Sequence, residues 1–223
     1  MKTIITFIVL VGFAFSANAQ SLRDFFTRND LKVTYLGIDF SHVKLVGNFS
    51  EFLDAGQKNP MEIRNVYFPR WNHVVLDERE KYDFAAMLRK YEIYYDIDMI
   101  SDINSRTPME ELLSYNPVRY TENDIRRFVN DYDLSGKSGL AIVYIAETLN
   151  KSSEEAWFHF VVLDMNSKDV LFQRRLRGVP NGFGLRNYWI NSLYRIIYDT
   201  QHYYFNEWRY RYEVENMEAN AGS

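Results

Sequence analysis

Runs of apolar residues mark the strands that this chain is expected to form. Residues 33–40 are β-branched and apolar on both faces, which is typical of an interior strand. Residues 140–146 and 157–163 are also continuous apolar runs, so we place both strands centrally in a sheet. The polar segment 164–169 has turn chemistry and joins the second run to a further strand over residues 170–177.

Apolar residues spaced three and four apart predict the helices. This spacing gives two helical pieces within residues 61–90, and Pro69 is expected to kink or break the first one. Thr107 and Thr121 each begin a further helix, because an acid three residues later completes a capping box. The last helix is long, over residues 185–215. The apolar stripes of the two pieces consist of Ile63, Val66, Tyr67, Trp71, Val74 and Val75, and of Tyr82, Phe84, Ala85 and Leu88.

Strict alternation over residues 92–100 predicts a half-exposed strand that carries Asp96 and Asp98 on one face, about 7 Å apart. Two carboxylates at this separation suit a hard cation or the acid and base of a glycoside hydrolase. The alternative is the solvated face of an edge strand. If the strand over residues 170–177 lies beside the strand over residues 92–100, the basic residues of the former would pair with Asp96 and Asp98 across the two strands. This basic run consists of Arg174, Arg175 and Arg177.

The element order is therefore β-α-α-β-α-β-β-β-α. A single mixed sheet of about five strands with helices packed on it satisfies this order best, which is an α/β (α+β) fold. The chain shows no internal repeat and no low-complexity linker, so we expect residues 20–223 to form one domain.

Residues 1–19 have the pattern of a secretory signal peptide. Lys2 supplies a positive start, an apolar stretch follows over residues 4–15, and Ala17-Asn18-Ala19 offers a signal-peptidase site. The apolar stretch is too short to span a bilayer, which needs about 20 residues. We expect cleavage after Ala19 and export to the periplasm or the medium.

Composition narrows the possible classes of protein. The absence of cysteine excludes disulfides, thiolate metal sites, a cysteine nucleophile and a bacterial lipid anchor. The full chain has 26 Lys and Arg against 30 Asp and Glu, and loss of Lys2 with the leader gives a net charge of −5. This acidic balance argues against nucleic acid as a partner. The sequence also contains 17 Tyr, 16 Phe and 4 Trp, which a large core or a binding surface would use.

The order of elements, together with one hairpin, resembles a known type of envelope domain. The hairpin consists of an apolar strand ending in Val161-Val162-Leu163-Asp164, a Ser167-Lys168 turn and a return strand Val170-Leu171-Phe172. This pattern is similar to the amino-terminal α/β domain of TolB and to the periplasmic part of curli-secretion channels. The resemblance implies an envelope assembly or interaction module. The chain departs from those families because it has no propeller repeats, no membrane hairpins and no lipobox cysteine.

Asp39, Ser41 and His42 are the residue types of a hydrolase triad, but sequence neighbours rarely form one. There is no Gly-x-Ser-x-Gly motif, so a polar cluster at a strand end is the favoured interpretation. The remaining histidines show no metal-binding spacing, and no metal or cofactor is expected. They are His73, His159 and His202.

Two further segments are candidate binding sites. The glycine-rich segment 178–184 precedes the last helix, where Gly182, Gly184 and Arg186 could hold an anion. A flexible crossing loop is the alternative. On the last helix, an exposed side would present aromatic residues to a partner, and the candidates are Tyr198, His202 and Phe205.

Three functions follow from these observations. The first is a non-enzymatic exported module that binds a protein or another envelope component. The second is an envelope hydrolase that uses Asp96 and Asp98, and the third is an anion or small-ligand binder at the glycine-rich segment.

Overall fold

The computed structural model describes residues 21–49 and 59–221, with side chains up to residue 213. The expected signal peptide, residues 1–19, lies outside the described residues. No helix in the described part of the chain is long and apolar enough to cross a membrane.

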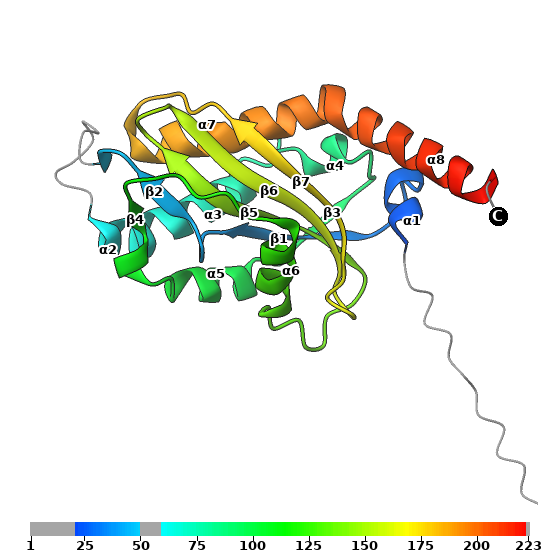
Figure 1. Cartoon of the computed structure of the whole chain (residues 1–223), viewed down its shortest axis with the longest axis horizontal. Coiled ribbons are helices and arrows are strands. Elements are labelled where there is room, and N and C mark those ends of the chain that lie inside the picture. The colour runs from blue at the N-terminus through cyan, green and yellow to red at the C-terminus, as the bar shows by residue number, and fades with distance from the viewer. Residues whose placement is uncertain (1–20, 50–58, 222–223) are drawn as a thin grey trace, which may run out of the picture.

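One mixed sheet of seven strands organises the fold (Figure 1). The central strand β5 pairs with β6 in antiparallel fashion on one side. On its other side, the first half of β5 pairs with β1 and the second half with β2, both parallel. β3 lies outside β1, β4 lies outside β2, and β7 pairs with β6. The strands are β1 (Val33–Asp39), β2 (Lys44–Val46), β3 (Ile93–Tyr95), β4 (Leu113–Ser114), β5 (Leu140–Asn150), β6 (Glu155–Asp164) and β7 (Val170–Gly178).

Because β1 and β2 share one side of β5, and β3 and β4 share the next position, the sheet is five strands wide. The expected mixed sheet with packed helices is confirmed. The central positions of β1, β5 and β6 are confirmed as well.

Two buried asparagines hold the chain where β1 ends. The side-chain amide of Asn72 accepts a hydrogen bond from the Ile38 amide at 2.7 Å, and that of Asn104 accepts one from the Phe40 amide at 2.6 Å. Both side chains also donate to the Ile38 carbonyl. The register of β1 against β5 shifts between Tyr35 and Ile38, which marks a β-bulge at this point. Gly37 adopts a φ of +118° there, and a Cβ at this position would approach the Asn72 side chain to 2.9 Å.

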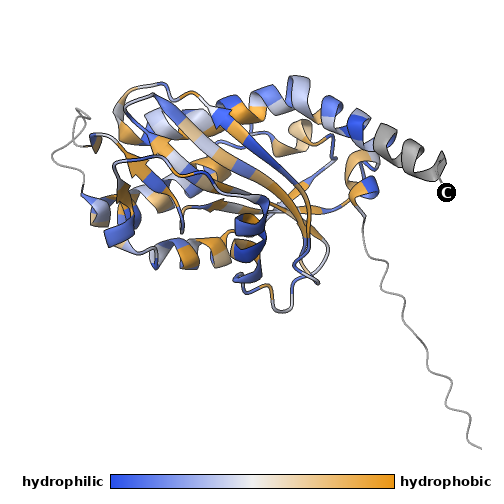
Figure 2. Cartoon of the chain, viewed as in Figure 1, coloured by the Kyte–Doolittle hydropathy of each residue, from blue (hydrophilic) through white to orange (hydrophobic). Residues whose placement is uncertain are grey.

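Helices cover both faces of the sheet. Figure 1 shows α7 and α8 along one side and α5 and α6 on the other. The larger core lies under α1, α3, α4, α7 and α8, and a smaller one lies under α5 and α6. Figure 2 shows the apolar residues gathered between these layers and hydrophilic residues along the outer helix faces and β7. The helices are α1 (Leu22–Thr27), α2 (Pro60–Glu62), η2 (Ile63–Tyr67), α3 (Phe68–Asp77), α4 (Phe84–Met87), α5 (Asp98–Ser105), η3 (Met109–Glu111), α6 (Glu122–Asn130), α7 (Gly184–Asp199), η4 (Thr200–Tyr204) and α8 (Phe205–Ala221).

Two helix predictions need correction. Of the two outcomes expected at Pro69, a kink or a break, the break is wrong, because Pro69 lies in the first turn of α3, directly after the π-helical turn η2. In that wider turn the Phe68 amide donates to the Ile63 carbonyl, and Pro69, which has no N–H to donate, follows at the second position of α3. The second helix is also shorter than expected, since only Phe84–Met87 is helical. The capping box at Thr121 is confirmed, with Asp124 as its acid.

The single strand predicted over residues 92–100 is wrong. Only Ile93–Tyr95 is a strand, and α5 begins at Asp98. The alternation of apolar residues continues into the helix by coincidence, because Ile97 and Ile100 are buried at helical spacing.

Candidate functional site

A buried ionic cluster lies on the face of the sheet that α6 covers in part, and it centres on Glu147. The register of β5 against β6 shifts between Ala146 and Thr148, so Glu147 is an extra residue in a β-bulge. Its side chain is fully buried. The bulge turns the carboxylate toward the same face as His159 of β6 and Arg175 of β7, which are directly paired in the sheet.

Four nitrogen atoms from three residues contact the Glu147 carboxylate. Arg175 donates from Nη2 to Oε1 at 2.6 Å and from Nε to Oε1 at 2.9 Å. His159 Nε2 lies 2.9 Å from Oε2, and the Tyr120 amide donates to Oε2 at 2.9 Å. Gln173 donates from Nε2 to His159 Nδ1 at 3.1 Å, so Nε2 of the imidazole carries the proton that Glu147 accepts.

The hydrogen bonds decide the protonation of this carboxyl. Burial alone would raise the pKa of Glu147, but the bonds from His159, from Arg175 and from the Tyr120 amide together lower it. The charge of Glu147 also affects Tyr120. Burial is the main cause that raises the pKa of Tyr120 to about 12, and the negative charge of Glu147 is the second. The cluster is thus an ionised carboxylate held by an arginine, a histidine and the Tyr120 backbone amide. It ties β5, β6 and β7 together.

Beyond the edge of α6, the sheet face opens into a groove. One depression of about 420 Å³ lies over the buried cluster, and a second of about 230 Å³ runs along β7. Glu122, Gln173 and Arg174 line both depressions, so we treat them as one surface and call it the β7 groove. Its remaining lining residues are Arg119, Tyr120, Thr121, His159 and Arg175 over the cluster, and Leu22, Arg126, Val170, Leu171, Phe172, Trp208, Arg211 and Tyr212 along the strand.

Five arginines line the β7 groove, and three of them have no ion pair among the described residues. Arg175 pairs with Glu147, and Arg211 pairs with Glu207. Arg126 instead donates to the Val170 carbonyl, at 3.3 Å. The other two are Arg119 and Arg174, both exposed. The groove therefore concentrates positive charge in a chain whose overall charge is negative.

The residues of the hydrolase hypothesis lie elsewhere. Asp96 follows β3 and forms an ion pair with Lys137, whereas Asp98 is exposed in the first turn of α5. They do not share a strand face. The expected pairing with the basic run of β7 is also wrong, because β3 and β7 lie at opposite edges of the sheet. In that run Arg175 pairs with Glu147, Arg177 pairs with Glu155, and Arg174 stacks on Phe172 with 4.4 Å between its guanidinium carbon and the ring centre.

Asp39, Ser41 and His42 form a polar cluster at the end of β1. Asp39 is fully buried, and its two oxygens accept bonds from the Tyr132 hydroxyl at 2.6 Å and from the Ser41 amide at 2.7 Å. The His42 ring stacks on Phe128 with 3.6 Å between ring centres, and burial lowers the pKa of His42. Both oxygens of Asp39 are engaged without His42, so the arrangement is that of a strand-end cluster.

The glycine-rich segment leads into α7. Gly182 and Gly184 both have positive φ, and the Gly182 amide is bonded to the Asn181 side chain at 2.8 Å. Arg186 pairs with Glu78 at 3.4 Å and donates to the Asn187 side chain at 3.0 Å. The Arg186 guanidinium is thus bonded to the side chains of Glu78 and Asn187.

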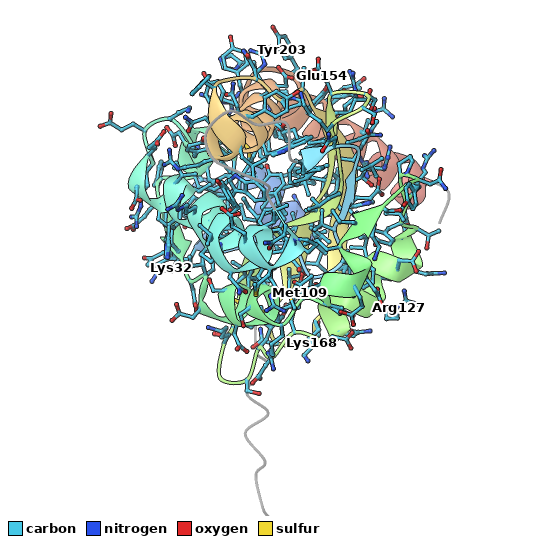
Figure 3. All side chains as sticks on the ribbon, turned by 90° about the vertical axis from the view of Figure 1, so that its left-hand side faces the viewer. Lys32, Met109, Arg127, Glu154, Lys168 and Tyr203 are labelled. Carbon is cyan, nitrogen blue, oxygen red and sulfur yellow. The ribbon has the colours of Figure 1, made fainter. Side chains whose placement is uncertain are left out.

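The aromatic residues of the last helix divide between the surface and the core. Tyr198 is exposed and stacks on His202 with 4.1 Å between ring centres. Figure 3 shows Tyr203 projecting from the surface of the molecule. Phe205, however, is fully buried, so its side chain cannot touch a partner directly.

Among the residues that the structure describes, no group of three or more His, Asp or Glu side chains is placed to hold a metal ion. His159 is part of the Glu147 cluster, and His73 and His202 are exposed.

The sequence reasoning missed Glu147 and the groove. The hairpin offered no signal, because a regular register from Asn150 opposite Glu155 would place residue 147 opposite Phe158, on the other face of the sheet from His159. Comparison with models of known protein families, with curated proteins and with solved structures gives no match for this chain.

Proposed function

We propose that this protein is an exported, non-enzymatic module of the cell envelope that binds an acidic protein partner in the β7 groove. The observation that carries the proposal is the set of three arginines in that groove, Arg119, Arg126 and Arg174, that have no ion pair within the described part of the chain. A guanidinium offers a planar fork of donors that matches a carboxylate.

The groove also has the mixed chemistry of a protein contact. Trp208 and Tyr212 of α8 and Leu22 of α1 line one of its sides, next to Arg211. Aromatic residues and arginine are the types enriched at the centres of protein interfaces. The last helix, which the sequence favoured as a contact surface, therefore contributes through the side that faces β7.

The envelope location rests on the leader of residues 1–19 and on the resemblance to envelope assembly modules. The hydrolase alternative gains no support from the geometry, because Asp96 pairs with Lys137 and Asp98 belongs to a different element.

The test is a comparison of three versions of residues 20–223 as bait for the envelope proteins of the source cell. The first is wild type. The second is the triple variant Arg119→Glu, Arg126→Glu and Arg174→Glu. The third is a matched control, Arg70→Glu, Arg195→Glu and Arg209→Glu, which changes the charge equally at exposed arginines outside the groove.

We expect wild type and control to retain the same partner, and the groove variant to lose it. Binding should also weaken as salt rises, because the contact depends on charge pairs at the surface. Equal recovery of that partner by the groove variant and by the control would overturn the proposal.

A further inference from the structure

The outer edge of β7 is open in the described structure. Among the described residues, β7 pairs with β6 and with no other strand. An edge strand of nine residues presents a row of backbone donors and acceptors that another strand can use. The β7 groove runs along the first half of this edge.

Two side-chain contacts show which backbone groups face outward. The Val170 carbonyl accepts a bond from Arg126 at 3.3 Å, and the Gln173 carbonyl accepts one from the Arg174 side chain at 2.8 Å. These carbonyls therefore point away from β6. Backbone groups alternate in direction along an antiparallel strand, so those of Arg175 and Arg177 face outward together with those of Gln173.

The two sides of the groove differ in chemistry. Gln173 and Arg175 face the α6 side, where Arg119 and Arg126 also lie. On the other side Phe172 packs into the larger core, beside Trp208 with 5.1 Å between ring centres, and the Arg174 guanidinium lies over the Phe172 ring. Side chains of an added strand would alternate between these two sides.

A second copy of the same chain is a poor occupant. Antiparallel pairing of two β7 strands would place the basic runs of both copies, each with Arg174, Arg175 and Arg177, against one another. Like charges across strands destabilise the pairing. The edge of β7 thus repels the β7 strand of a second copy and attracts an acidic segment.

Resting on the proposed function, we propose that the edge of β7 accepts an extended acidic segment of the partner protein as an additional strand. Acidic residues of that segment face Arg119 and Arg126 on the α6 side. Apolar residues at the alternate positions face Trp208, Tyr212 and Leu22 on the α8 side. Backbone bonds to the outward groups of β7 supply affinity, and the alternation of acidic and apolar residues supplies specificity.

The probes are four synthetic peptides. One alternates Glu and Val, and a second alternates Lys and Val. Two more repeat the Glu and Val sequence with N-methyl groups either on all Glu amides or on all Val amides. Only one of these two sets of amides can face β7 in a bound strand. Affinity for residues 20–223 and hydrogen exchange of the β7 amides are measured for each peptide.

We expect the Glu and Val peptide to bind and to slow exchange at Gln173, Arg175 and Arg177. One N-methylated form should bind at least about tenfold more weakly, because it loses several backbone bonds, and the other should bind as the parent does. The Lys and Val peptide should not bind.

Other outcomes separate the two proposals. If both N-methylated forms bind like the parent, while the variant Arg119→Glu, Arg126→Glu and Arg174→Glu does not bind, the strand addition is overturned and the acidic contact stands. If the Lys and Val peptide binds as well as the Glu and Val peptide, the acidic contact itself is overturned. Failure of the Glu and Val peptide to bind at millimolar concentration overturns the strand addition.

Discussion

Arg175 of the edge strand reaches across β6 to Glu147 of the central strand, with 2.6 Å between Nη2 and Oε1. The carboxylate is fully buried and the guanidinium side chain is 23% exposed, so the pair lies between the core and the floor of the groove. Removing one partner of such a pair leaves a buried group without compensation, which costs far more than losing a surface pair. The Glu147 cluster therefore holds β7 in place on the sheet.

We expect Glu147→Gln to lower the free energy of unfolding by about 3 kcal/mol, since Arg175 and His159 lose their charged acceptor. The matched control is Glu155→Gln, which breaks the more exposed ion pair that joins β6 to Arg177 of β7 and should cost at most about 1 kcal/mol. Urea unfolding of both variants gives the comparison. Equal losses in the two variants would contradict a special role for Glu147.

Long-range contacts of this kind explain why the site was harder to predict than the fold. The apolar runs predicted β1, β5, β6 and β7 because each is buried on both faces or alternates along its length. Glu147 comes directly after the run that ends at Ala146, and only the bulge turns it toward His159. The groove is formed by segments far apart in sequence, and no local pattern marks it.

The failures of the fold prediction have a similar cause. β1 ends at Asp39, one residue before the predicted end, where Asn72 and Asn104 from two different helices bond to the backbone at Ile38 and Phe40. Residues 92–100 alternate like a strand, yet the chain turns into α5 so that Ile100 packs under the smaller core. In both places tertiary packing outweighs the local pattern.

Lys90 is expected to make stability depend on pH. Its ammonium donates to the Phe25 and Arg28 carbonyls at 2.6 and 2.7 Å, and burial lowers its pKa to about 8 from an ordinary value of 10.5. Between these values the unfolded chain binds more protons than the folded one, so stability rises with pH. From pH 7.5 to 9.5 the gain should be ~2 kcal/mol.

The control for this prediction is Lys90→Met, in which the rise should disappear. The measurement stops below pH 10 because burial raises the pKa of Tyr35 and Tyr82. Folded tyrosines with a raised pKa stay protonated while unfolded ones ionise, so stability falls again above that pH. An unchanged slope in Lys90→Met would show that another group is responsible.

Gly178, the last residue of β7, lies against α7. A Cβ at this position would come within 2.5 Å of the Ser192 carbonyl oxygen, which is backbone and cannot move aside cheaply. We expect Gly178→Ala to destabilise the protein by about 2–3 kcal/mol through overpacking. Gly136→Ala meets no atom within 4 Å and should lose only about 1 kcal/mol from its φ of +75°. Thermal unfolding distinguishes the two, and a smaller loss at Gly178 would contradict the close contact.

In the last helical segment, two aromatic residues that are two positions apart should differ sharply in their effect on stability. Phe205 is fully buried and packs against Phe25 and Phe26, so Phe205→Ala should cost about 3–5 kcal/mol. Tyr203 is 64% exposed, and Tyr203→Ala should change stability by less than about 0.5 kcal/mol. Urea unfolding of both variants measures this, and similar losses would mean that the helix is rotated on the sheet.

Binding of an acidic partner in the β7 groove is best tested by measuring the affinity of the purified partner for two charge-matched variants. One carries Arg119→Glu, Arg126→Glu and Arg174→Glu, and the other carries Arg70→Glu, Arg195→Glu and Arg209→Glu. We expect the groove variant to bind at least about tenfold more weakly than the control at low salt, with a difference that shrinks as salt rises. Equal affinities of the two variants would contradict this expectation.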